Sequence, residues 1–277
     1  MLPIYISRGF LQIHYNYEGI YYLVAILASL IYATYLAKKD NIDPEMIYEA
    51  GFICILTALV TGRLFSFLFW EPFVLLKNPL LFFQVWKGGI TVAGGVLGGL
   101  VAGYVFARVK KYHFFYHIQY FVPAILLAQV IGRFGCFLNG DAAGLPTNSI
   151  FGVVFHPKSV AYMATGIMPG TPLHPTQLYE MFGNLLLFIF IISTRNIKWI
   201  RDRSIVWYAL GYSTVRFIVE FFRNDTVRFA GIPFFTSGQL ICLIGYAFGF
   251  FMLIWSLLNE DKLIPNEENI ARPPVKK

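Results

Sequence analysis

The chain has 277 residues, of which 57% are hydrophobic and only 13% are charged. Soluble domains carry about 25% charged residues, so the composition excludes a soluble protein and indicates an all-α, polytopic membrane protein. The net charge of +7 does not indicate a nucleic-acid partner, because the basic residues are spread over short loops, where they suit topology signals and contact with membrane lipids.

Seven apolar stretches predict seven transmembrane helices, because each is long enough to cross a bilayer. They cover about 19–37, 46–70, 88–108, 117–135, 177–194, 204–222 and 236–257. Residues 1–18 are expected to form an interfacial segment, and the apolar loop 72–87 is a candidate re-entrant segment. We therefore predict a single membrane domain over 1–258, with the long loop 136–175 at the outer face and a cytoplasmic tail over 259–277.

The third predicted helix is rich in glycine. Gly95, Gly99 and Gly103 fall four residues apart on one face, which permits a neighbouring helix to approach closely. The same glycines could line a groove for lipid access, but close helix packing is the role that we favour.

The basic residues predict an orientation. Of the 22 lysines and arginines, 13 lie after the first, third, fifth and seventh predicted helices, and six lie on the opposite side. Basic residues concentrate in cytoplasmic loops, so the N-terminus is predicted outside and the C-terminus in the cytoplasm. The remaining three, Arg63, Arg133 and Arg216, lie within predicted helices or at their ends.

Cysteine usage and the other motifs exclude several kinds of site. Cys54, Cys136 and Cys242 are widely spaced, which fits neither a disulfide framework nor a zinc site. Nothing resembles a metal-ligand cluster or a GxxxxGK phosphate loop. The N-terminus lacks a basic stretch followed by an apolar core and a small-residue cleavage site, so no removable signal peptide is expected.

Arg133 follows an almost purely apolar run over 123–131. An arginine at a bilayer centre costs about 2.5–3.5 kcal/mol, so it needs an anionic partner, a watery cavity or a shallow position. Gly132 permits close approach of the backbone, and Asn139 and Asp141 add polar groups nearby. Two interpretations remain open: a site that holds a lipid phosphate, and a helix end whose arginine reaches the interface.

Tyr212, Arg216, Glu220 and Arg223 are spaced four, four and three residues apart, which places them in one stripe on a helix. Charges in an apolar helix are expected to face the bundle interior or a cavity. Internal ion pairs centred on Glu220 are one explanation. However, one glutamate cannot neutralise both arginines, and guanidinium groups pair well with phosphate, so an anionic ligand is the explanation that we favour.

A third polar motif, His174-Pro175-Thr176-Gln177-Leu178-Tyr179-Glu180, leads into the fifth predicted helix. Thr176 is expected to cap this helix, with Glu180 in its first turn. His174 could equally be a solvated loop residue or a functional one.

These motifs resemble known sequence blocks. The segment from Gly132 to Gly144 resembles the signature of the prolipoprotein diacylglyceryl transferases, and 174–180 and 212–223 resemble two further blocks of that family. Gly62-Arg63-Leu64 and the paired glycines 88–89 and 94–95 fit as well. The resemblance covers about 45–257.

The resemblance implies a multi-pass transferase of the bacterial cytoplasmic (inner) membrane. Such an enzyme moves the diacylglyceryl group of phosphatidylglycerol to the lipobox cysteine of a prolipoprotein signal peptide, forming a thioether and releasing glycerol phosphate. No cofactor or metal is implied.

The resemblance also implies roles for individual residues. Arg133 would bind the headgroup, Arg216 would hold the phosphate as charge develops, and Tyr212 would lie beside the reacting centre. The expected substrate-binding residues are Arg133, Gly132, Asn139, Asp141, Gly144, His174, Glu220, Arg223 and Arg63.

The chain departs from the family pattern at three positions. Ala93 stands where the family often has a histidine that is favoured as general base, Cys136 where asparagine is common, and Asp141 where glutamate is common. The arginines could still stabilise a thiolate, and His174 or Tyr212 could take the proton.

We therefore expect an active transferase and keep two alternatives. The first is a catalytically silent paralogue that binds phospholipid or lipoprotein signal peptides. The second is an anion transporter, against which the absence of inverted repeats argues. The sequence does not specify acyl-chain preference, protein substrates or oligomeric state.

Overall fold

A computed structural model describes residues 5–6, 20–70, 78–83, 91–157, 159–163, 165–224 and 236–259. The described residues of Met1–Tyr32 and Ile118–Leu263 form one compact unit, here unit 1, and those of Ala33–His117 form a second, unit 2. The predictions for most of 1–18 and 72–87, for Gly88 and Gly89, and for the tail beyond 259 lie outside the described residues.

Seven long helices appear among the described residues, each where an apolar stretch predicted one. They are α1 (Ile20–Lys39), α2 (Pro44–Trp70), α4 (Val92–Val109), α5 (Phe114–Asn139), α7 (Thr176–Ser193), α9 (Ser204–Glu220) and α10 (Ser237–Leu258). Five of them, α1, α2, α5, α7 and α10, are long and apolar enough to cross a membrane. This confirms an all-α protein with several membrane-spanning helices.

The short elements are η1 (Pro79–Phe83), α6 (Val160–Met163), α8 (Lys198–Arg201) and the strands β1 (Tyr5–Ile6) and β2 (Val153–Val154). The two strands pair in antiparallel fashion, with Tyr5 opposite Val154.

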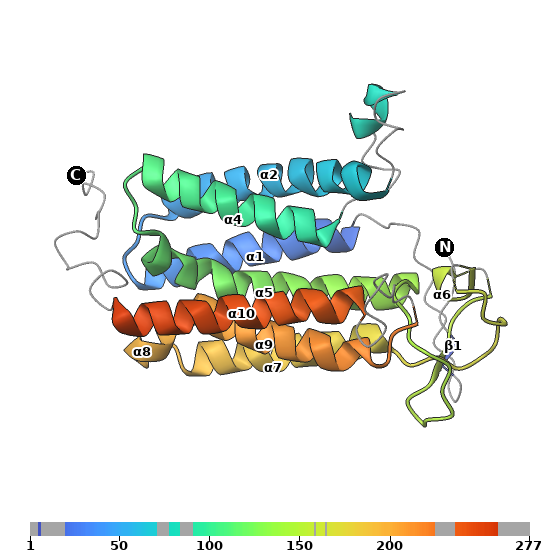
Figure 1. Ribbon diagram of the computed structural model, residues 1–277. Helices are drawn as coiled ribbons and strands as arrows, with labels where there is room; N and C mark the ends of the chain where they lie inside the picture. The colour runs from blue at the N-terminus through green and yellow to red at the C-terminus, as the bar shows by residue number, and fades with distance from the viewer. Residues whose placement is uncertain are drawn as a thin grey trace. The chain divides into compact units, whose positions relative to one another are not determined.

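In unit 2, α2 and α4 lie side by side (Figure 1). Cβ atoms placed on Gly95 and Gly99 would lie 3.9 and 3.8 Å from the Ala58 side chain of α2, which confirms the predicted packing face. Gly94 is closer still, because an added Cβ would lie 2.8 Å from the carbonyl oxygen of Thr61. The Thr61 hydroxyl donates to the Gly94 carbonyl oxygen at 2.9 Å, so these glycines serve helix packing.

In unit 1, α9 packs against α7 and α10 (Figure 1). Cβ atoms added at Gly183 of α7 and Gly245 of α10 would overlap Val215 and Ser213 of α9. Helix α5 joins the group through Gln129, whose Nε2 donates to the Tyr208 hydroxyl of α9 at 2.8 Å. The interior faces of four helices are therefore close enough for their side chains to meet.

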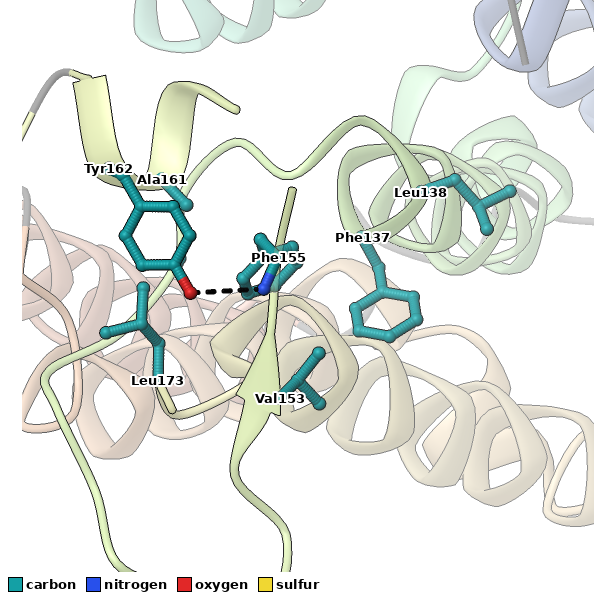
Figure 2. Packing of buried hydrophobic residues seen from close by; sticks show 8 residues of the cluster. Phe137, Leu138, Val153, Phe155, Ala161, Tyr162 and Leu173 are labelled. Carbon is teal, nitrogen blue, oxygen red and sulfur yellow. Dashed lines mark hydrogen bonds between the residues drawn. The ribbon is translucent and has the colours of Figure 1, made fainter. Parts of the chain in front are cut away.

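The connection between α5 and α7 has its own apolar core (Figure 2). The backbone N–H of Phe155 donates to the Tyr162 hydroxyl at 3.2 Å, and that hydroxyl donates to the Thr171 carbonyl at 2.8 Å. Phe137 at the end of α5 meets Phe155 with ring centroids 6.0 Å apart. The connection is thus a folded segment anchored on α5.

Two local predictions need correction. Helix α5 continues through Asn139, beyond the predicted end near 135, so Arg133 lies inside the helix. The next residue, Gly140, has a φ of +76°, which suits the glycine that follows a helix C-terminus. The predicted cap at Thr176 is wrong, because Pro175 is the N-cap residue. The Thr176 hydroxyl instead donates to the Ala142 carbonyl at 2.6 Å, which fixes the loop after α5 to the start of α7.

Candidate active site

A buried carboxylate near the start of α7 joins side chains from two other helices. The side chain of Glu180 is 1% exposed, and its Oε1 lies 2.9 Å from Arg133 Nη2 of α5. Its Oε2 lies 3.5 Å from Arg216 Nη1 of α9. The Tyr212 hydroxyl, one turn before Arg216, donates to Oε1 at 3.3 Å. All three residues with an expected catalytic role therefore meet at Glu180.

A second carboxylate, Glu220, completes the stripe on α9. Arg216 Nη2 lies 2.9 Å from Glu220 Oε2, and Arg223 Nε lies 3.9 Å from the same oxygen. The Thr236 hydroxyl donates to Glu220 Oε1 at 2.9 Å. Both internal ion pairs that the spacing allowed are present.

The same carboxylate lies against the first turn of α10. Thr236 caps this helix in a capping box with Gln239, and a Cβ added at Gly238 would overlap the Glu220 carboxylate. The N-terminus of a helix carries partial positive charge that favours an anion. Glu220 is therefore held in place from both α9 and α10, and it holds Arg216 in turn.

The cluster made by these residues carries an excess positive charge. Among the described side chains it contains the three arginines Arg133, Arg216 and Arg223 and the two carboxylates Glu180 and Glu220, which gives +3 − 2 = +1. The arginine side chains are only 21%, 18% and 11% exposed. Charges withdrawn from water are costly unless they are paired, so one further negative charge would balance these five residues; Asp141, whose carboxyl also interacts with Arg133, is not counted among them.

The predicted residues after α5 form the neighbouring wall. The side chain of Asn139 hydrogen-bonds the Asp141 carboxyl, and burial raises the pKa of Asp141, while Arg133 opposes that shift. Gln177 Nε2 donates to the Asp141 carbonyl at 2.6 Å. These contacts fix Asp141 next to the start of α7.

Gly144 is the point where three segments meet. Its N–H donates to the His174 carbonyl at 2.9 Å, and the next N–H, of Leu145, donates to the Phe222 carbonyl at 2.8 Å. An added Cβ would lie 2.7 Å from His174 Cβ. Gly144 therefore permits a close backbone approach that a side chain would prevent.

Within the described part of the chain, the polar contact of the His174 ring is with Tyr179. Its Nδ1 lies 3.0 Å from the Tyr179 hydroxyl, and its ring packs on Phe222 with centroids 5.1 Å apart. Burial lowers the pKa of His174, so the imidazole is neutral at physiological pH. These contacts support a positioning role in the wall of the site.

Arg63 and Gly132 are the remaining predicted residues, and each has surroundings of its own. Arg63 belongs to unit 2, where Nη2 donates to the Leu81 carbonyl at 2.7 Å and Nε to the Phe82 carbonyl at 3.2 Å. Gly132 precedes Arg133, and a Cβ added there would meet open space, with no atom within 4 Å among the described residues.

An apolar groove of about 360 Å³ lies beside the cluster. Its walls come from α7, α9 and the preceding connection, and its lining residues are Phe151, Tyr179, Gly183, Val215, Ile218, Val219 and Phe222. Tyr179, Val215 and Val219 each directly precede a residue of the cluster. A charged site and an apolar groove thus lie on adjacent faces of the same two helices.

Comparison with known proteins identifies the family. The family model described as prolipoprotein diacylglyceryl transferase matches residues 3–255. The chain belongs to this family. The family resemblance inferred from the three sequence motifs is confirmed.

Three relatives are each called phosphatidylglycerol–prolipoprotein diacylglyceryl transferase. The relative from Fusobacterium nucleatum is 29% identical, over 91% of this chain and 97% of its own length. A Proteus mirabilis relative is 31% identical over 95% and 94%, and a Gloeobacter violaceus relative is 34% identical over 85% and 87%.

In this member of the prolipoprotein diacylglyceryl transferase family, sequence interpretation missed two residues of the cluster. Glu180 was noted near the helix start but not included in the site, although a carboxylate in an apolar helix is itself a signal of function. Thr236 is the first residue of a T-x-x-Q capping box, a sequence pattern that marks a helix start. Its further bond to Glu220 depends on how α9 and α10 pack.

Proposed function

We propose that this protein transfers the diacylglyceryl group of phosphatidylglycerol to the thiol of a prolipoprotein lipobox cysteine. A thioether forms and glycerol phosphate leaves. The observation that carries the proposal is the meeting of Arg133 and Arg216, from α5 and α9, at one buried carboxylate in a cluster of net charge +1. The phosphodiester of phosphatidylglycerol carries one negative charge, and the family match supports the same substrates.

The cluster suits the departure of a phosphate. The thiol sulfur attacks the glyceryl carbon next to the phosphodiester, and the carbon–oxygen bond breaks with its electron pair going to the phosphate oxygen. Guanidinium groups that are already in place stabilise this developing charge without reorganisation, and one such donor typically contributes about 10²–10³-fold to the rate. Arg133 and Arg216 are the proposed donors, and Tyr212 lies beside the reacting centre.

The proposed substrate pocket extends from the cluster. The open flank at Gly132 leaves room for the headgroup next to Arg133. Glu220 holds Arg216 and is itself contacted by Arg223, and both Glu220 and Arg223 are proposed to border the bound headgroup. Asn139, Asp141, Gly144 and His174 are proposed to form the wall after α5. The apolar groove between α7 and α9 suits the apolar portion of a lipid substrate.

For Arg63 we propose a supporting role within unit 2 in addition to the expected part in substrate binding. Its contacts with the carbonyls of Leu81 and Phe82 and its position 4.7 Å above the Phe67 ring support the conformation of η1 within unit 2.

We further propose that all seven long helices cross the bacterial inner membrane, with the N-terminus outside and the C-terminus in the cytoplasm. The distribution of basic residues supports this orientation. Residues 1–258 would then form one membrane domain, with 259–277 as a cytoplasmic tail.

The test is transfer by the purified protein in nanodiscs that contain phosphatidylglycerol. A lipobox peptide should gain the mass of a diacylglyceryl group, and Arg133→Ala and Arg216→Ala should abolish that gain. Arg201→Ala is the matched control, because Arg201 pairs with Asp202 outside the cluster and should transfer at close to the wild-type rate. Wild-type protein that binds the lipid without transfer would support the silent paralogue, and anion flux through liposomes would support a transporter.

A further inference from the structure

The carboxylate that joins the two arginines has unused hydrogen-bonding capacity. Glu180 Oε2 and Arg216 Nη1 are both buried, and neither makes a hydrogen bond within the described part of the chain, although they lie 3.5 Å apart. Glu180 Oε1, in contrast, is bonded by Arg133 and by the Tyr212 hydroxyl. One side of the carboxylate is therefore firmly held and the other is loosely paired.

A substrate phosphate would compete with this carboxylate for the arginines. Guanidinium groups bind phosphate and carboxylate in the same bidentate manner, and the cluster has excess positive charge for only one further anion. When a phosphate binds Arg133 and Arg216, Glu180 loses its ion pairs with these arginines and lies near the negatively charged phosphate. Binding of the lipid would therefore leave Glu180 oxygens available to the Tyr212 hydroxyl.

Tyr212 is partly buried and bonds the fully buried Glu180. Its hydroxyl donates to Glu180 Oε1 at 3.3 Å, and its ring is held by stacking on Tyr208, with centroids 5.7 Å apart and an interplanar angle of 10°. Glu180 is itself too buried, at 1% exposure, to meet a peptide directly. The Tyr212 oxygen can take a proton from outside while its own proton moves to Glu180.

We propose that Tyr212 and Glu180 act together as the proton acceptor for the attacking thiol. The inference rests on the transferase function proposed above. The S–H bond breaks as the sulfur bonds to the glyceryl carbon; the thiol proton moves to the Tyr212 oxygen, and the Tyr212 proton moves to Glu180. Glu180 then gives this proton to the departing glycerol phosphate, whose second ionisation has a pKa of about 6, and Tyr212 and Glu180 regain their starting protonation.

This assignment distinguishes between the two acceptors that the sequence left open. His174 bonds Tyr179 and packs on Phe222, whereas Tyr212 bonds the carboxylate that both arginines contact. The reaction therefore has a proton acceptor beside the phosphate site without using His174.

The test measures kcat and KM for phosphatidylglycerol in Glu180→Gln, Tyr212→Phe and the double variant. General-base catalysis typically contributes about 10²–10⁴-fold, so kcat should fall by such a factor in each single variant. KM should stay the same or fall in Glu180→Gln, because an anion that competes with the phosphate is gone. The double variant should be no slower than the slower single variant, since residues that act as one unit are not additive.

Tyr246→Phe is the matched control, because it removes a hydroxyl whose hydrogen bond to the Thr214 hydroxyl is exposed and lies outside the cluster, and it should leave kcat within about threefold, a free-energy change below 1 kcal/mol. The proposal is overturned if kcat is unchanged in Tyr212→Phe, or if the losses of the single variants multiply in the double variant. A raised KM with unchanged kcat in Glu180→Gln would show a structural role only. If Glu180→Gln does not fold, Tyr212→Phe alone decides. A wild-type protein without transfer would reject the proposed function and not this inference.

Discussion

Two glycines of the first motif, Gly132 and Gly144, should respond in opposite ways to substitution by alanine. A Cβ at Gly132 meets open space among the described residues, and the position lies inside α5. A Cβ at Gly144 would lie 2.7 Å from His174 Cβ and 2.8 Å from the His174 carbonyl oxygen. The same chemical change therefore probes a ligand-facing position and a protein-packing position.

The expected free energies of unfolding follow from these contacts. Alanine inside a helix is favoured over glycine by about 1 kcal/mol, so Gly132→Ala should stabilise the protein by up to that amount. Overpacking costs about 1–3 kcal/mol, and the two backbone hydrogen bonds at Gly144 and Leu145 contribute about 0.5–1.5 kcal/mol each. Gly144→Ala should therefore destabilise the protein by about 2–6 kcal/mol.

Thermal unfolding of both variants in the same detergent checks the prediction, followed by KM for phosphatidylglycerol. Gly132→Ala should unfold at or above the wild-type temperature and raise KM, because its methyl group occupies space proposed for the headgroup. Gly144→Ala should unfold at a clearly lower temperature. Equal destabilisation of both variants, or wild-type KM in a stable Gly132→Ala protein, would refute this reasoning.

Three further predictions concern the surroundings of the cluster. Burial lowers the pKa of His174, so the folded state favours the neutral imidazole. The free energy of unfolding of the wild type should therefore fall as the pH drops through about 6.5, and it should fall less in His174→Gln. Unfolding measured from pH 7.5 to 5 checks this. Asn184 is fully buried, and neither polar side-chain atom has a hydrogen bond within the described residues, so Asn184→Leu should raise the free energy of unfolding by about 1–3 kcal/mol; lower stability would contradict this. Gly238→Ala should reduce transfer at least tenfold by displacing Glu220 from Arg216. Gly99→Ala should not, because its added Cβ would make only ordinary contacts, at 3.7 and 3.8 Å.

The helices were predictable because their apolar stretches are long and uninterrupted. The glycine face of α4 and the stripe on α9 were also predictable, since residues spaced four apart share one side of a helix. For the same reason the ion pairs of Glu220 with Arg216 and Arg223 could be anticipated from the sequence.

The meeting of Arg133, Tyr212 and Arg216 at Glu180 was not predictable from spacing. It depends on how α5, α7 and α9 pack, and no local pattern encodes the distance between side chains on different helices. The same limit applies to Thr176, which has the residue type of a helix cap but donates to the Ala142 carbonyl of another segment. The end of α5 was misjudged because Cys136, Phe137, Leu138 and Asn139 continue the helix past Gly135.

The most direct test of the phosphate site at Arg133 and Arg216 is a structure of the protein with phosphatidylglycerol bound. We predict phosphate oxygens at charge-assisted hydrogen-bond distance, about 2.7–2.9 Å, from guanidinium nitrogens of both Arg133 and Arg216, with Glu180 displaced from at least one of them. A phosphate bound elsewhere, with both arginines still paired to Glu180, would contradict it.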